Sequence, residues 1–132
     1  MECDIQILMD NYQLKEGTFL YGLVEEATFH EAYFWNYYNA QIEINKQTIN
    51  KSLDRELTKI VHWVHKRIHD LLLCHFIETN VYSIAKLPES KLIYFTERLD
   101  FMMEGYFGNF VMSEKQFGDD IKNPNYPELY KN

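Results

Sequence analysis

Hydrophobic positions recur at helical spacing along most of this chain. The clearest pattern runs from Leu53 to about Glu78, where apolar residues fall three or four positions apart over several turns. These positions are Leu53, Leu57, Ile60, Val61, Val64, Ile68, Leu71 and Leu72. The pattern predicts an amphipathic helix with one face toward a protein core.

A second helix is predicted from about Phe29 to about Lys46. At about 100° per residue, its apolar side chains fall on two faces, one with Phe29, Tyr33, Tyr37, Ala40 and Ile44 and the other with Phe34, Trp35, Tyr38 and Ile42. The letters TFHE fit a capping box, in which the Thr28 hydroxyl bonds the amide of Glu31. A helix that is apolar on both sides is expected at the centre of the fold.

A third helix is predicted from about Pro88 to Gly105 or Gly108. Proline is preorganised for a first helical turn, and glycine can supply the left-handed residue that ends a helix. The expected core stripe of this helix is Leu92, Phe95, Leu99, Met103 and Tyr106.

The two ends of the chain have weaker patterns. Within residues 1–27, the alternation at Ile5 and Ile7, and again at Phe19 and Tyr21, suits short strands as well as a helix. Residues 111–132 are polar and contain X-Pro steps, which favour extended backbone. The sequence therefore predicts a mainly α fold: a single-domain helical bundle over 1–132 with a short strand or irregular segment at its N-terminus and a mostly irregular tail.

Composition narrows the classes of partner. Thirteen basic and twenty acidic residues give a net charge of −7, which disfavours nucleic acid and anionic membranes as partners and allows a basic protein. The apolar stretches are too short to span a bilayer, and the acidic N-terminus does not resemble a secretory signal. Two cysteines are too few for a disulfide framework. We therefore expect a cytoplasmic protein.

Catalytic signatures are weak, and we expect a protein that is not an enzyme and needs no cofactor. Cys74 lies in an apolar turn and is expected to pack as a small hydrophobic residue. The neighbouring carboxylates Glu25/Glu26 and Asp119/Asp120 are expected to be solvated charges. The glycines near residue 105 follow a predicted helix, whereas a phosphate-binding loop precedes one.

Histidines provide the one candidate for a metal site. His62, His65 and His69 fall within about 60° of one another on the predicted 53–78 helix. The nearest acid on that side of the helix is Asp54, two turns away, so a hydrolytic zinc site would lack a nearby general base. The simpler interpretation is that these histidines flank the core stripe. His75 falls on that stripe and is expected to be buried and bonded to a polar partner.

The predicted third helix offers a stronger candidate for binding a partner. Glu97, Asp100 and Glu104 fall on the side opposite its core stripe. Ile93, Tyr94 and Phe101 share that side. Acidic charge can steer a basic partner while large apolar side chains carry affinity. Alternatively, this is an ordinary solvated face whose aromatics pack under the N-terminal segment.

Several segments of the chain resemble small immunity proteins of bacterial polymorphic toxin systems. They are FHEAYFWNYYNAQIEI at 29–44, LDREL at 53–57, HFIETNVYSI at 75–84 and TERLDFMMEGYFGNF at 96–110. The group that they resemble most is the mostly helical immunity proteins of contact-dependent growth inhibition.

The resemblance implies a cytosolic inhibitor that binds the C-terminal toxin domain of a secreted effector, often a nuclease such as an RNase, and blocks its active site. It does not identify contact residues, because such families diverge at the contact surface. Two other functions fit the same residues: an acidic adaptor or regulatory module, and a metal-binding helical protein that uses His62, His65 and His69.

Overall fold

Helices dominate the fold, as the sequence predicted. The computed structural model describes residues 2–79 and 81–131, which contain five α-helices. These are α1 (Glu2–Tyr12), α2 (Phe19–Glu25), α3 (Glu31–Thr48), α4 (Arg55–Cys74) and α5 (Leu92–Gly108). Short 3-10 turns occupy Glu89–Lys91, Glu114–Gln116 and Pro127–Tyr130. Within the described residues, the only β pairing is a single bridge between Thr28 and Ala85.

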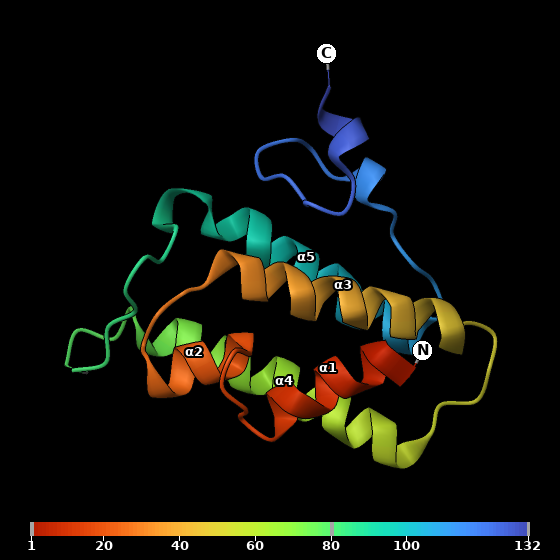
Figure 1. The fold of residues 1–132 in the computed structure, drawn as a ribbon, viewed down its shortest axis with the longest axis horizontal. Helices are drawn as coiled ribbons and strands as arrows, with labels where there is room; N and C mark the ends of the chain where they lie inside the picture. The colour runs from red at the N-terminus through yellow and green to blue at the C-terminus, as the bar shows by residue number, and fades with distance from the viewer. Residues whose placement is uncertain (1, 80, 132) are drawn as a thin grey trace.

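Helix α3 is the central element, as its two apolar faces predicted. It packs against α1, α2 and α5, while α1 and α2 also contact α4 (Figure 1). An aromatic cluster joins three of these helices: the Phe34 ring on α3 lies 5.4 Å from that of Phe19 on α2 and 4.9 Å from that of Phe95 on α5, both edge-to-face. Such pairs stabilise a core beyond their buried area.

The predicted capping box at the start of α3 is wrong. The helix begins at Glu31 with His30 as its N-cap, and no side chain caps it. Thr28 instead forms the backbone bridge to Ala85, and its hydroxyl donates to the Glu26 carbonyl at 2.9 Å. The Glu31 carboxylate accepts a hydrogen bond from the Trp35 indole at 3.1 Å. Backbone pairing with Ala85, which is distant in the sequence, therefore takes Thr28 away from the capping position that the local sequence predicted.

Helix α4 confirms the clearest sequence pattern. Asp54 caps its start by accepting a hydrogen bond from the Leu57 amide at 2.8 Å. The core stripe is buried at Val61, Val64, Ile68, Leu71 and Leu72. The helix ends one turn before the predicted limit.

His75 directly follows α4 and has the predicted polar partners, but it is half-buried and not fully buried. Its Nδ1 accepts a hydrogen bond from the Ile84 amide at 2.9 Å, so Nε2 carries the proton and donates to Glu89 at 2.8 Å. The ring thus holds the chain that returns from α4 toward α5.

Helix α5 ends at Gly108, as predicted, but the left-handed residue that follows is an asparagine and not a glycine. Asn109 takes the left-handed conformation at φ 65°. Its side-chain amide donates to Asn50 Oδ1 at 2.8 Å, and its side-chain oxygen accepts from the Asn50 amide. Asparagine tolerates this backbone region and adds a contact to the α3–α4 loop that glycine cannot make. The predicted core stripe is buried from Phe95 to Tyr106.

The N-terminal segment is helical, which decides between the strand and the helix that its pattern left open. The Asn11 side chain is buried and accepts a hydrogen bond from the Leu20 amide at 3.1 Å, which links α1 to the start of α2. Thr18 caps α2 by accepting from the Tyr21 amide. Both side chains bond amides in the first turn of α2, which is too short to show a clear period.

The chain after α5 forms a small lobe above α3 and α5 (Figure 1). Apart from two 3-10 turns, residues 109–131 contain no helix or strand. Three of its side chains are nevertheless buried: Glu114, Ile121 and Asn123. Asn123 pairs with Asn39 of α3 through two amide hydrogen bonds of 2.7 and 2.9 Å.

Candidate functional site

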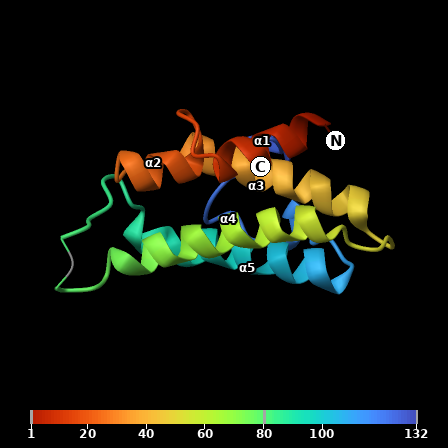
Figure 2. The ribbon, with the colours of Figure 1, turned by 90° about the horizontal axis from the view of Figure 1, so that it is seen from below.

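Helices α4 and α5 lie side by side and run in opposite directions (Figure 2). Two contacts fix their register: Thr58 Oγ1 lies 2.9 Å from the Tyr106 hydroxyl, and His69 Nε2 lies 3.6 Å from an Asp100 carboxylate oxygen. Just beyond the two helices, His75 bonds Glu89. The histidine stripe and the acidic stripe therefore adjoin. We call this surface the α4–α5 face; it comprises His62, His65 and His69 with Ile93, Glu97, Asp100, Glu104 and Phe107.

The acidic side chains of the face are poorly compensated. Asp100 and Glu104 are exposed, and Glu97 is half-buried. Across residues 2–79 and 81–131, neither Glu97 nor Glu104 forms an ion pair, and Asp100 has only the 3.6 Å approach to His69. This stripe of α5 therefore presents negative charge to solvent.

The apolar side chains of α5 divide into two groups. Ile93 is 65% exposed. Tyr94 is half-buried against the core, and Phe101 packs edge-to-face on Phe117 with 6.0 Å between ring centroids. The aromatic residue thus packs under the C-terminal tail, whereas the alternative hypothesis placed it under the N-terminal segment.

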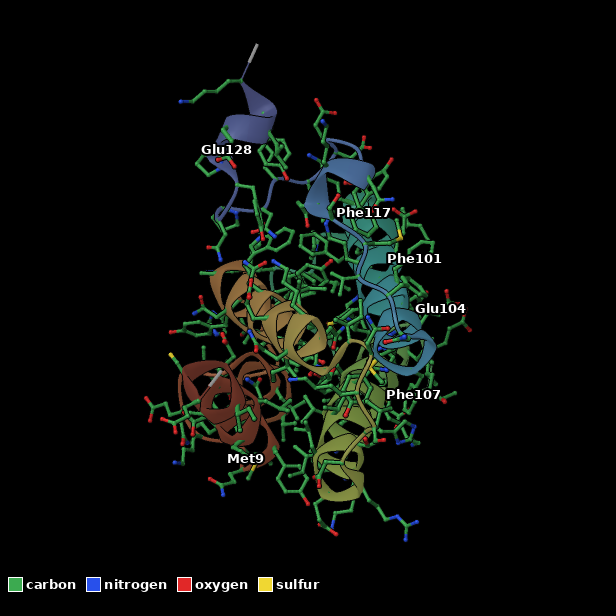
Figure 3. The ribbon with its side chains drawn as sticks, turned by 90° about the vertical axis from the view of Figure 1, so that its right-hand side faces the viewer. Met9, Phe101, Glu104, Phe107, Phe117 and Glu128 are labelled. Carbon is green, nitrogen blue, oxygen red and sulfur yellow. The ribbon has the colours of Figure 1, made fainter. Side chains whose placement is uncertain are left out.

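Phe107 belongs to this face and was missed by the sequence prediction. It is 54% exposed and follows Glu104 by three residues, so it continues the stripe of Ile93, Glu97, Asp100 and Glu104. Figure 3 shows Phe101, Glu104 and Phe107 along the outer side of α5, with Phe117 of the tail beyond Phe101. The helical spacing alone could have identified it.

Two of the histidines lie close to Asp100, an acid that the sequence analysis did not pair with them. Ligand atoms of His65, His69 and Asp100 all lie within 4.8 Å of one another, and the two imidazole centroids are 4.4 Å apart. His62 is exposed and lies outside this cluster. The expectation that Asp54 is the nearest acid is wrong, because the antiparallel packing of α5 on α4 brings Asp100 to the histidines.

Burial and like charge act on His65. Desolvation, followed by the neighbouring His69 and His62, lowers the pKa of His65 to about 4, although a hydrogen bond with the Leu99 backbone opposes the shift. The ring is therefore neutral at neutral pH. The Nε2 atoms of His65 and His69 are both shielded from water and have no hydrogen-bond partner.

A separate hollow lies away from the α4–α5 face. It has a volume of about 540 Å³ and lies between α3 and the tail, where Tyr38, Ile42, Met112 and Tyr126 contribute to its walls. Glu114 also lines it, but its carboxylate is bound to Arg98. Lys46 and Lys115 line it as well, so this hollow combines an apolar surface with positive charge and lies apart from the acidic stripe of α5.

Comparison of the chain with models of known protein families, with curated proteins and with solved structures finds no match. Among the described residues, no helix combines the length and apolar character needed to cross a bilayer. The candidate site therefore rests on its own geometry.

Proposed function

We propose that this chain is a non-catalytic immunity protein that binds a cognate toxin domain, such as an RNase, through the α4–α5 face and neutralises it. The observation that carries the proposal is the outer stripe of α5, where Asp100 and Glu104 are exposed between the exposed apolar side chains Ile93 and Phe107. The resemblance to helical immunity proteins supports the same function.

Electrostatics supply the first part of the mechanism. A nuclease binds the phosphates of its substrate with Lys and Arg side chains, so its active-site cleft is positively charged. The net charge of −7 and the uncompensated Glu97 and Glu104 attract such a cleft and speed the encounter. The carboxylates then occupy positions that substrate phosphates would take.

Apolar anchoring supplies the second part. Exposed aromatic and aliphatic side chains contribute most of the affinity when a partner buries them. Ile93 and Phe107 are available for this because they point away from the core stripe of α5. On its opposite side, the helix is fixed by Phe95, Leu99 and Met102, each 1% exposed, so the binding surface is preorganised.

The proposal is tested by titrating a toxin with the purified chain. The toxin domain encoded beside the gene for this chain is purified, and its RNase activity is measured at increasing amounts of the chain. We expect a one-to-one complex and a linear fall in activity that reaches zero at one equivalent. Full activity at a tenfold excess contradicts the proposal. A stable complex that leaves activity unchanged instead supports the adaptor function.

A further inference from the structure

The cluster of His65, His69 and Asp100 has the composition of a transition-metal site. The two histidines are four residues apart on α4, which places both imidazoles on one side of the helix. Asp100 adds a carboxylate from the antiparallel helix. Two imidazole nitrogens and one carboxylate oxygen suit Zn²⁺ and similar ions, whereas Mg²⁺ and Ca²⁺ prefer oxygen ligands alone.

The distances are compatible with a site that closes on binding. Ligand atoms around a tetrahedral zinc ion lie about 3.3 Å apart, given bonds of about 2.0–2.1 Å. Here they all lie within 4.8 Å of one another. The Asp100 side chain is 63% exposed and can rotate toward the ion. The Nε2 atoms of both histidines are shielded from water, so the ion reaches them as Asp100 moves.

The hydrogen bonding of the histidines points to a missing ligand. The Nε2 atoms of His65 and His69 are shielded from water and have no hydrogen-bond partner, although buried polar atoms are nearly always paired. Asp100 approaches His69 only to 3.6 Å, which is beyond hydrogen-bond distance. A metal ion satisfies both nitrogens and the carboxylate together.

The charge near the cluster also favours occupancy. Lys66, the cation beside His65 in the sequence, has its ammonium group 2.9 Å from Asp70, which compensates its charge.

We infer that His65, His69 and Asp100 form a surface site for a divalent transition-metal ion of the Zn²⁺ type, with the fourth coordination position left to water. Three protein ligands and one open position are typical of zinc sites that exchange a ligand. The inference does not rest on the proposed function, because zinc binding needs no partner protein, although Asp100 belongs to both the metal cluster and the acidic stripe.

Calorimetric titration of the untagged, EDTA-treated full chain with ZnCl₂ tests the inference. We expect one equivalent to bind and, because the ion binds the folded state, the melting temperature to rise with zinc concentration. Absence of binding, or several weak equivalents without a saturable first one, overturns the inference.

Substitutions identify the ligands. Asp100→Asn changes an exposed side chain with little change of shape, so it tests the ligand on α5 without endangering the fold. His69→Gln tests a ligand on α4. Each is expected to weaken zinc binding by at least about 10-fold, since even outer-shell changes have effects of that size. His62→Gln is the matched control and should leave affinity unchanged. Circular dichroism confirms folding of each variant. Equal losses for His62→Gln and His69→Gln overturn the assignment.

Discussion

Arg98 on α5 and Glu114 in the C-terminal tail form an ion pair that is almost completely buried. Arg98 Nε donates to Glu114 Oε1 at 2.7 Å, and the two side chains are 2% and 3% exposed. The guanidinium lies 4.6 Å from the Phe117 ring centroid and 5.6 Å from that of Trp35. This pair fixes the tail to the back of the helix that carries the proposed binding stripe.

Removing one partner of this pair should destabilise the fold strongly. Glu114→Ala leaves the Arg98 charge buried without compensation, so we expect the free energy of unfolding to fall by about 3–5 kcal/mol. Urea denaturation measures this loss. Asp70→Ala is the control, because it breaks the more exposed pair with Lys66 and should lose about 0.5 kcal/mol or less. Similar small losses in both variants would contradict the account.

The end of α5 provides a test of backbone conformation. Asn109→Ala and Asn109→Gly both remove the amide pair with Asn50, but only alanine is strained at φ 65°. We expect the alanine variant to be less stable than the glycine variant by about 1 kcal/mol. Thermal and urea unfolding compare the two, and equal stabilities would show that the left-handed conformation is unimportant.

Because of Tyr82, the free energy of unfolding should fall as the pH becomes alkaline. Its hydroxyl donates to the Leu23 carbonyl at 2.6 Å, and burial raises the pKa of Tyr82 to about 12. Because the folded pKa exceeds the unfolded value of about 10, this stabilisation is complete below pH 10 and is lost between pH 10 and 12.

Tyr82→Phe tests that relationship. At pH 7 the variant should be less stable by about 1 kcal/mol, since it lacks the hydrogen bond. The difference from the unmodified chain should shrink as pH rises from 10 to 12. The buried Tyr37 and Tyr38 are common to both proteins, so their effects cancel. A constant difference in urea midpoint across this range would refute the assignment.

Sequence periodicity predicted the long helices because each buries a continuous stripe. The stripes of α4 and α5 and the two apolar faces of α3 are visible in the order of residues. Helix ends were less predictable, since contacts distant in sequence decide them: Thr28 pairs with Ala85, and Asn109 with Asn50. The short helix α2 depends on side chains that bond its first amides, Asn11 and Thr18.

The sequence predicted which residues of the candidate site share a face of one helix, but not which helices lie together. Spacing placed Glu97, Asp100 and Glu104 on one stripe and His65 and His69 on another. Their proximity follows from the antiparallel register of α4 and α5, which no local pattern encodes. Likewise, Phe101 was expected at the surface, and its coverage by Phe117 depends on where the tail returns.

The central claim is that the acidic stripe of α5 binds a basic partner. It is tested with the variant Glu97→Lys/Asp100→Lys/Glu104→Lys against the control Glu16→Lys/Glu25→Lys/Glu128→Lys, whose acidic residues are exposed on other elements. Three reversals add six charges in either case, so both variants change the net charge from −7 to −1.

The deciding measurement is the association rate constant of each variant with the cognate toxin domain at low and high salt. The account predicts that the α5 variant associates at least about 10-fold more slowly at low salt, with a flattened salt dependence, while the control is affected much less. Equal rates for the two variants would contradict it.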